Sequence, residues 1–424
     1  MRLGRTATTI HRRDIARQGV TLLEVLVVIS IMLILLAVAV PRLRPMMEQR
    51  RIREASRTVS GFFYAARSRA METGRPVGVA IERLKSQPEA AVTLRMVEVP
   101  PPYCGDTTAA KARVRKRADG YFEVQFTGDV SLLVQLVKVG DLITFESQSV
   151  RYRIGSLGPN SLIARLLDLT DTPWPVQQDP NEPPKWSHPV SFQIHRRPEP
   201  SSAMPVRLPP GTVIDLVASG SDSWFLEYDQ ERRSPPPPNG LKWAVPGFVP
   251  FVRENNFDPS PVIVLFRPDG GVDKVYRHRY QVFWNPAEET WQAQPVYEGI
   301  GVTEPIYFLI GAWDRMPAQG TLAEPLKAND PTRDSSPTYV WPSTAEPPPE
   351  PPKRRQPSLA EDGLYNWQDL TNFWLVVNPS TGLAVTAPVA APEGGFAVVG
   401  GAKVPSNLFT ARYDARQMKA VGGR

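Results

Sequence analysis

The chain has 424 residues, of which 42% are hydrophobic and 22% are charged, and these values exclude a wholly disordered protein. Its formal net charge is +6, but much of the excess lies early, because residues 42–75 hold nine arginines and three glutamates. No basic patch with interleaved aromatic residues recurs in the rest of the chain, so nucleic-acid binding is not expected. The 46 prolines favour a loop-rich body built from strands.

A long apolar run follows a basic segment of 19 residues. Val20 to Val40 contains one formal charge, Glu24, and the next residue is Pro41. A helix needs roughly 20 apolar residues to cross the hydrocarbon core of a bilayer, so the run is predicted to span a membrane. A cleavable secretory signal has a shorter apolar core of roughly 7–15 residues. Because an ionisable group is costly inside a membrane, Glu24 is a candidate functional residue.

This arrangement resembles the processing site of type IV prepilins, which the pilins share with the pseudopilins of type II secretion. Gly19 matches the last leader residue, Val20 the first mature residue, Glu24 the fifth and Pro41 the twenty-second. The resemblance implies that a membrane prepilin peptidase cuts between Gly19 and Val20 and then methylates the new amine. The family usually has Phe where this chain has Val20.

The resemblance also implies how Glu24 could act in assembly. Its carboxylate could pair with the new amine on Val20 of a neighbouring subunit, and losing one partner of a buried pair costs ~3–5 kcal/mol. Glu24 would then select the stagger between subunits. The alternative is a plain anchor in which Glu24 sits near the positive end of the helix dipole.

Charge alone leaves the orientation of the span open. Five arginines precede the apolar run and six follow it closely, so the positive-inside rule does not decide between the two directions. The resemblance places the leader in the cytoplasm and the body outside the inner membrane, with a single pass at residues 20–40.

The helical pattern resumes beyond Pro41 and reaches Gly74. Arginines and glutamates fill much of one face of this segment, as expected for an amphipathic helix. The opposite face carries Leu43, Met47, Ile52, Ala55, Val59, Phe62, Ala66 and Ala70. Pro41 is predicted to kink the helix without ending it, and Gly74 to stop it. Residues 20–74 are therefore predicted to form one helix, with residues 42–74 laid on the body.

Residues 75–424 consist of β-rich runs separated by Pro, Gly and Asp, which indicates strands and turns. Strands are expected at 76–81, 94–99, 121–126, 132–139, 142–145, 150–154, 190–195, 208–215, 262–266, 275–284, 306–310 and 373–377. The predicted fold is α+β, with the long helix packed on a largely antiparallel sheet, as in type IV pilins. Residues 406–420 suggest a short terminal helix.

Four pieces of the chain resemble the H class of minor pseudopilins and their FimT-like relatives. They are the helix end at 65–70 with the following 74–76, the turn and strand at 208–215, the strand and turn at 262–270, and the strand and turn at 373–382. The insertions between these pieces cover about 85–187, 219–258 and 285–365. Proline-dense tracts lie at 174–189, 235–238 and 317–357. We interpret the tracts as surface linkers, with a proline-motif ligand as the alternative.

Motifs for catalysis or metal binding are not found in the sequence. It has no HExxH, no Cys/His cluster, no phosphate-binding loop and no G-x-S-x-G elbow, so neither an enzyme nor a metal or cofactor site is expected. Asp168, Asp171 and the pair Glu361-Asp362 could hold calcium, but a solvated loop is preferred. The single cysteine, Cys104, excludes an intramolecular disulfide and is expected to be a small buried residue and not a reactive thiol.

Taken together, the residues predict a structural subunit of a type II secretion pseudopilus or a type IV pilus. Its partners would be prepilin peptidase, other pilins or pseudopilins and, indirectly, an assembly ATPase and a platform protein. One alternative is a single-pass membrane-anchored binding module or enzyme whose prepilin-like N-terminus is coincidental. A second keeps the processing site but places the chain in a DNA-uptake or adhesive pilus.

Overall fold

The computed structural model describes residues 22–117, 120–146, 148–167, 185–228, 241–251, 260–285, 290–316, 365–393, 396–399, 402–405 and 408–418. It divides into two compact units, residues 1–50 and 51–424. The structure confirms an α+β fold with mainly antiparallel sheets. The predicted proline tracts at 235–238 and 317–357, and most of the tract at 174–189, lie outside the described residues.

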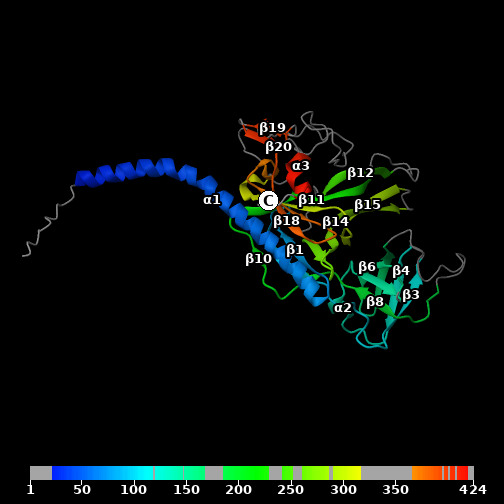
Figure 1. Cartoon of the computed structure of the whole chain (residues 1–424). Helices are drawn as coiled ribbons and strands as arrows, with labels where there is room; N and C mark the ends of the chain where they lie inside the picture. Colours follow the sequence, from blue (N-terminus) through cyan, green and yellow to red (C-terminus); the bar gives the residue numbers. More distant parts are fainter. Residues whose placement is uncertain are drawn as a thin grey trace, which may run out of the picture. The chain divides into compact units, whose positions relative to one another are not determined.

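Helix α1 runs from Leu22 to Thr73 and is assigned as continuous through Pro41 (Figure 1). Its first part belongs to the first unit and its second part, from Arg51, to the second unit. Within the described residues, no helix has both the length and the apolar character needed to cross a membrane. The predicted span at 20–40 begins outside the described residues, and the kink at Pro41 stays a prediction.

The second unit is built around one large antiparallel sheet, which we call the main sheet. Its strands in the described part of the chain are β1 (Val77–Arg83), β2 (Ala90–Glu98), β9 (Glu199–Pro200), β10 (Val206–Arg207), β11 (Thr212–Tyr228), β12 (Leu241–Pro250), β13 (Val262–Phe266), β14 (Val272–Asn285), β15 (Thr290–Ile300), β16 (Ile306–Ala312), β17 (Phe373–Val377) and β18 (Ala384–Pro388). They follow the order β15-β14-β13-β1-β2-β11-β16-β17-β18, with β9 and β10 on β2 and β12 on β11.

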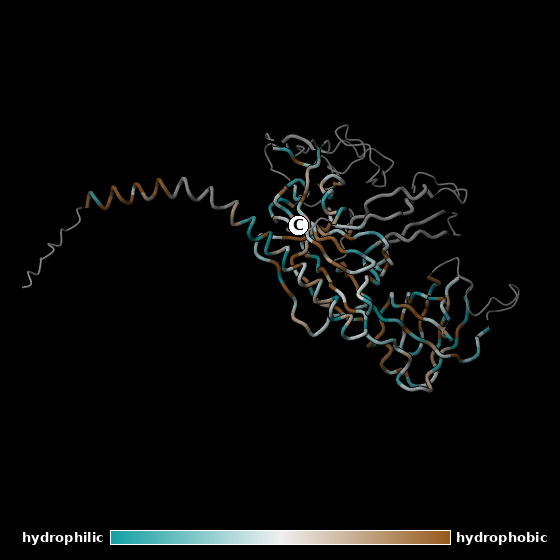
Figure 2. The backbone as a smooth tube through the Cα atoms, in the orientation of Figure 1, coloured by the Kyte–Doolittle hydropathy of each residue, from teal (hydrophilic) through white to brown (hydrophobic). Residues whose placement is uncertain are grey.

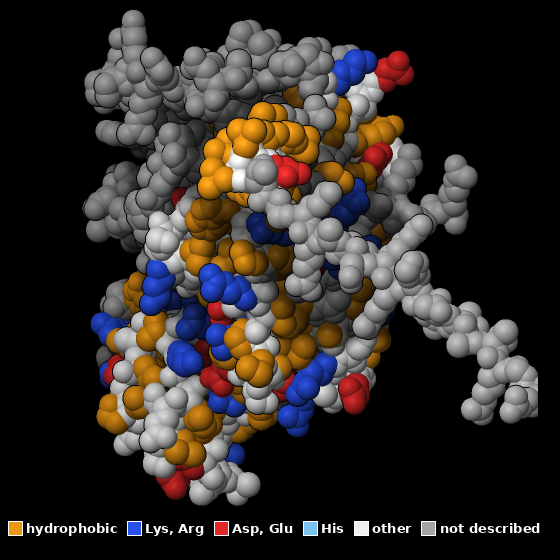
Figure 3. All heavy atoms as spheres, turned by 90° about the vertical axis from the view of Figure 1, so that its left-hand side faces the viewer, with side chains coloured by type: hydrophobic (Ala, Val, Ile, Leu, Met, Phe, Trp, Pro, Cys, Tyr) orange, Lys and Arg blue, Asp and Glu red, His pale blue; other side chains and the backbone are white. Residues whose placement is uncertain are grey.

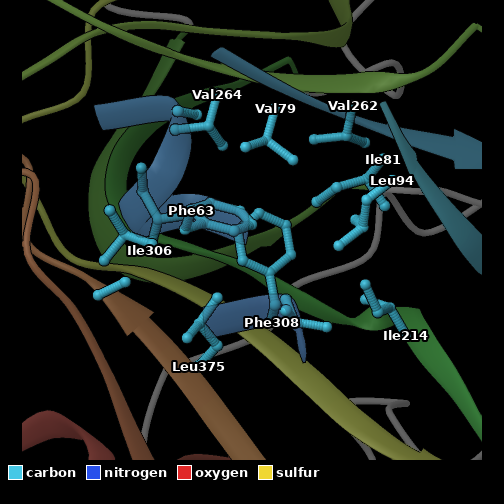
Figure 4. Packing of buried hydrophobic residues seen from close by; sticks show 14 of the residues in the cluster. Phe63, Val79, Ile81, Leu94, Ile214, Val262, Val264, Ile306, Phe308 and Leu375 are labelled. Carbon is cyan, nitrogen blue, oxygen red and sulfur yellow. The ribbon is translucent and has the colours of Figure 1, made fainter. Parts of the chain in front are cut away.

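One face of the main sheet packs against the second part of α1. Phe63 lies at the centre of this core, with its ring centroid 6.2 Å from that of Phe266 and 5.5 Å from that of Phe308. Figure 4 shows Phe63 among side chains from β1, β13 and β16. Every residue of β13 and of β16 is buried, which indicates that these strands are covered on both faces.

Short helices near the C-terminus supply a second core. They are η2 (Asn366–Gln368), α3 (Leu408–Ala411) and α4 (Tyr413–Arg416). Trp374 on β17 is fully buried there and its indole N–H donates to the carbonyl oxygen of Ala411 at 2.9 Å. The predicted terminal helix at 406–420 is therefore wrong as a single element, because the turn breaks at Arg412. The guanidinium group of Arg412 stacks 4.7 Å from the ring centroid of Tyr307.

A second sheet, which we call the inserted sheet, lies between β2 and β9 in the chain. Its strands are β3 (Lys111–Lys116), β4 (Phe122–Thr127), β5 (Leu142–Phe145), β6 (Tyr152–Leu157), β7 (Ser161–Leu166) and β8 (Phe192–His195), in the order β3-β4-β7-β6-β5-β8. Figure 2 shows brown apolar positions alternating with teal polar ones along these strands, as expected when one face is buried. The inserted sheet has a core of its own, separate from that under α1.

The inserted sheet leaves and rejoins the main sheet at one place. Tyr103, which follows β2, forms a β-bridge with Ile194 on β8, and the two connections are joined by the Arg196 guanidinium, which donates to the carbonyl oxygen of Pro101 at 3.3 Å. An ion pair between Arg153 on β6 and Glu298 on β15 joins it to the main sheet, with each side chain 12% exposed. The predicted insertion at 85–187 contains most of the inserted sheet and also β2, which pairs with β1 and β11 in the main sheet.

Two further local predictions are wrong. The expected strand at 132–139 contains α2 (Leu133–Leu136) instead. Leu133 and Val137 are buried one turn apart, which suits a helical turn, and Asp106 accepts the backbone N–H of Leu132 at 3.0 Å where this turn begins. Cys104, expected to be buried, is exposed, because the chain turns its neighbour Tyr103 into the core of the inserted sheet.

Candidate processing and assembly segment

The predicted processing residues precede the first described residue, Leu22. Gly19 and Val20, with the leader of residues 1–19, lie outside the described residues. Glu24 lies in the first turn of α1 and is exposed. Glu24 therefore lies in the first described turn of α1, close along the chain to the expected cleavage site.

The first part of α1 presents apolar side chains on all sides. From Leu22 to Leu35 every described side chain is exposed, and Leu22 and Ile34 are 85% and 65% exposed. The Ser30 hydroxyl donates to the carbonyl oxygen of Leu26 at 2.8 Å, so this polar group is satisfied within the helix. Figure 2 shows the brown apolar residues of this stretch. A continuous exposed apolar surface of this kind marks a site of interaction with protein or lipid.

The second part of α1 buries one face only. The fully buried apolar side chains on it are Ile52, Ala55, Val59, Phe63, Ala66 and Ala70. Their spacing of three or four residues places them along one stripe of a helix with 3.6 residues per turn. Of the eight apolar positions predicted for the buried face of residues 42–74, five are fully buried: Ile52, Ala55, Val59, Ala66 and Ala70. Phe62 is partly buried against the same core, whereas Met47 is exposed, contrary to the prediction.

Arg67 fixes this part of α1 to two turns of the main sheet. Its Nε donates to the carbonyl oxygens of Gly270 at 3.1 Å and Thr381 at 2.9 Å. Gly270 has φ +89° and Gly382 has φ +65°, a backbone region that favours glycine. A Cβ atom on Gly382 would lie 1.9 Å from the Gly270 oxygen, so only glycine lets the turns meet.

The turns beneath Arg67 were singled out in the sequence, but their meeting was not. Gly270 and Thr381 lie 203 and 314 positions away from Arg67. No local pattern reports a contact over such a separation. The helix then ends at Thr73, whose hydroxyl donates to the Arg69 carbonyl oxygen at 2.8 Å, and Gly74 follows with φ +65°.

A buried carboxyl group lies in β11, in the sheet that α1 covers. Burial raises the pKa of Asp215 to about 6, although the backbone N–H groups of Ala218 and Val217 donate to its side chain at 3.1 Å and oppose the shift. The pairing register between β11 and β16 shifts between Asp215 and Gly220. In this segment the Ser219 hydroxyl accepts the backbone N–H of Leu309 at 2.8 Å. Asp215 thus organises an irregular segment of the strand.

Groups for metal chemistry are not assembled in the described residues, where no cluster of three or more His, Cys, Asp or Glu side chains could hold an ion. The calcium candidates Asp168, Asp171, Glu361 and Asp362 lie outside the described residues. In the described residues, α1 carries exposed apolar side chains in its first part and packs on the main sheet in its second part.

Comparison with known families gives a match that includes the first part of α1. Residues 16–40 match the prokaryotic N-terminal methylation motif. The match supports a type IV pilin-like protein. No curated protein and no solved structure matched the chain in the corresponding comparisons.

The matched motif covers the residues on which the processing prediction depends. Gly19, Val20 and Glu24 all fall within residues 16–40. The motif supports processing by prepilin peptidase, assembly with other pilins, and membrane anchoring through the N-terminus. The match ends before the body, so it gives no information on residues 41–424.

Proposed function

We propose that the chain is a structural subunit of a type II secretion pseudopilus or a type IV pilus. The observation that carries this proposal is the N-terminal methylation motif at residues 16–40. In this proposal prepilin peptidase cuts between Gly19 and Val20, and the amine of Val20 is then methylated. The protein acts by assembly and performs no bond chemistry of its own.

The helix supplies the means of assembly in this proposal. Residues 20–40 anchor the chain in the inner membrane in a single pass, with the leader in the cytoplasm and the body in the periplasm. Glu24 pairs with the free amine of a neighbouring subunit, and an assembly ATPase and a platform protein drive insertion into the filament. The body, from Arg51 onward, is carried on α1 through the core around Phe63.

Within the pilin-like proteins, we propose that the chain is most similar to the H class of minor pseudopilins. The support is the end of α1, where Gly74 leads into β1, and the turns after β13 and β17 that Arg67 holds together. These are the positions at which the sequence resembles that class. The alternative is a membrane-anchored binding module or enzyme that uses the same N-terminal segment only as an anchor.

The decisive measurement is the N-terminal sequence and intact mass of the protein extracted from membranes of cells with and without prepilin peptidase. We expect an N-terminus at Val20, with the added mass of one methyl group, only when the peptidase is present. Gly19→Ala should block cleavage, whereas Gly4→Ala, a matched change inside the leader, should leave it intact. An uncut leader in peptidase-containing cells would contradict the proposal.

Glu24→Gln separates processing from assembly. The change removes the charge but keeps the shape of the side chain, and losing one partner of a buried ion pair costs ~3–5 kcal/mol. We expect the variant to be cut at Val20 and to be incorporated into filaments at least roughly 100-fold less than the native chain. Normal incorporation of Glu24→Gln would assign the assembly contact to other residues.

A further inference from the structure

The inserted sheet begins with β3 and ends with β8 in its strand order, and the residues that lead into β8 bring these two ends together. The backbone N–H of Ala112 on β3 donates to the carbonyl oxygen of Val190 at 2.8 Å, and the Val190 N–H donates back to the Ala112 oxygen at 2.9 Å. The Ser187 N–H donates to the carbonyl oxygen of Val114 at 2.9 Å, and the Ser187 hydroxyl accepts the Val114 N–H at 3.0 Å. We call these four hydrogen bonds the seam.

The hydrogen bonds around β8 alternate between its two sides. Backbone groups of neighbouring residues in a strand point in opposite directions. The Ser191 carbonyl oxygen accepts the N–H of Glu146, which follows β5, at 3.0 Å. Val190, one residue earlier, bonds across the seam, and Ile194 exchanges two backbone hydrogen bonds with Tyr103 at 2.8 and 2.9 Å. Residues 190–195 are therefore hydrogen-bonded on both sides, as a strand inside a closed sheet must be.

Aromatic contacts inside the inserted sheet require the same closure. The ring centroids of Phe126 on β4 and Phe192 on β8 lie 4.7 Å apart. Three strands, β7, β6 and β5, separate β4 from β8 in the strand order. In a flat sheet, strands that far along the order would lie about 19 Å apart. The inserted sheet therefore curves until its ends meet, and its enclosed side chains form the core that contains Phe126 and Phe192.

We propose that the inserted sheet is a closed six-stranded barrel that folds and opens as a unit of its own within the body. Each of its described strands has a neighbour on both sides, and closure of this kind removes the edges of a sheet. The core of the barrel contains no residue of the main sheet among the described residues. A partner would then bind the outer side chains of the barrel, because strand addition needs an open edge.

Two described ion pairs link the inserted sheet to the main sheet. Lys138, which precedes β5, pairs with Glu199 on β9 at 3.5 Å, and their side chains are 61% and 38% exposed. Arg153 on β6 pairs with Glu298 on β15. Exposed ion pairs contribute little to stability, and Figure 3 shows Lys and Arg side chains beside Asp and Glu side chains on one face of the molecule. Domains that meet through polar contacts keep separate motions unless their interface is large and apolar.

The first test compares neighbouring amides of β3 in the native full chain. The N–H groups of Ala112 and Val114 donate across the seam, whereas Arg113 between them is paired with Gln125 on β4. Hydrogen exchange of the detergent-solubilised chain would be read at single amides by mass spectrometry with fragmentation. In a closed barrel, Ala112 and Val114 should exchange within about tenfold of Arg113. Exchange about 100-fold faster at Ala112 and Val114 would show an open sheet and overturn the proposal.

The second test asks whether the barrel opens separately, using a matched pair of buried aromatic residues. Phe192 lies in the core of the inserted sheet and Phe308 in the core under α1. Phe192→Ala leaves a cavity and should speed amide exchange in β4, β5 and β7 about 100-fold or more. Exchange in β1 and β13 should change by less than about threefold. Phe308→Ala should give the converse result.

The outcome of the second test does not depend on the proposed function, because the exchange of the body is read whether or not the leader is cut. Equal acceleration in both sheets after Phe192→Ala would mean that the body unfolds as one cooperative unit, and this result would overturn the independent barrel. Phe192→Leu removes less volume and gives the same comparison if Phe192→Ala does not accumulate in membranes. Acceleration confined to the inserted sheet in either variant is the expected result.

Discussion

The two parts of α1 differ in what they bury. From Leu22 to Leu35 large apolar side chains are exposed on every side, whereas from Ile52 to Ala70 apolar side chains are buried along one stripe. Both parts are rich in apolar residues and belong to one helix. The two parts differ in the periodicity of their apolar residues. A helix that is apolar all round cannot bury all of its apolar side chains against one face of a sheet. The pattern of apolar residues, more than their number, decides which part of the helix belongs to the body.

The strongest test of this difference is Phe63→Ala. Phe63 is fully buried between Phe266 and Phe308, so its loss removes apolar contact and leaves a cavity that costs ~3–5 kcal/mol in the free energy of unfolding of the body. Chemical denaturation of the detergent-solubilised full chain, followed by tryptophan fluorescence, would measure it. Tyr64→Ala is the matched control, since this neighbour is exposed and should change the value by under about 0.5 kcal/mol. Equal losses for both variants would contradict the assigned buried face.

The free energy of unfolding of the body is expected to depend on pH through Asp215. Its pKa of about 6 lies above the ordinary value of about 4, so the folded state holds the proton more tightly than the unfolded state. The stability of the native body should therefore fall as the pH rises from about 4 to about 6. Two pKa units correspond to at most ~3 kcal/mol.

Asp215→Asn should remove that dependence, because the amide oxygen can still accept the N–H groups of Val217 and Ala218. We expect the free energy of unfolding of Asp215→Asn to equal that of the native chain at pH 4 and to exceed it at pH 8. Asp269→Asn should have the opposite effect on the pH dependence of the free energy of unfolding. The Gly271 N–H lowers the pKa of Asp269, so its contribution is lost only in acid. An unchanged pH profile in Asp215→Asn would assign the titration to another group.

Arg67→Gln tests the link between the helix and the sheet turns. It removes charged hydrogen bonds to Gly270 and Thr381, each worth about 1.5–3 kcal/mol when fully shielded, and partial exposure reduces the expected loss to ~1–2 kcal/mol. Denaturation of the body would show it. Arg75→Gln, at an exposed arginine just past the helix, should have almost no effect. Similar values for the two variants would mean that the turns hold together without Arg67.

The smallest effect is expected in the first part of α1. Leu26 is 57% exposed, so Leu26→Ala should alter the free energy of unfolding of the body by under about 0.5 kcal/mol. The measurement is the same denaturation experiment. A loss comparable with that of Phe63→Ala would show that the apolar part of the helix contributes to the core of the body.

The parts of the fold that follow from local sequence were predicted well. The expected strands at 142–145 and 373–377 coincide with β5 and β17, since a short β-branched and aromatic run between turn residues is sufficient to identify them. The expected strand at 132–139 failed because two apolar residues one turn apart suit a helix, while alternation along the same letters suggested a strand. A side chain elsewhere, Asp106, starts the turn.

Part of the candidate site was likewise predictable from local sequence, and part of it was not. Gly19, Val20 and Glu24 lie within one contiguous motif, so the sequence alone indicates them; they fall within the matched residues 16–40, and their individual roles stay predictions. The contacts of Arg67 could not be predicted, because they join segments that only the folded sheet brings together. Nor could the separation between the core under α1 and the core of the inserted sheet be predicted, since apolar strands of one sheet or the other look alike in sequence.

The joint at Tyr103 and Ile194 gives the body a form of modularity. The chain returns beside the point where it left, because Tyr103, which follows β2, pairs with Ile194 on β8, and β9 then pairs with β2. An element attached in this way can be shortened, enlarged or exchanged with little demand on the core under α1. The main sheet is then the constant part of the body that packs on α1, and the inserted sheet is a part that can vary without disturbing that packing.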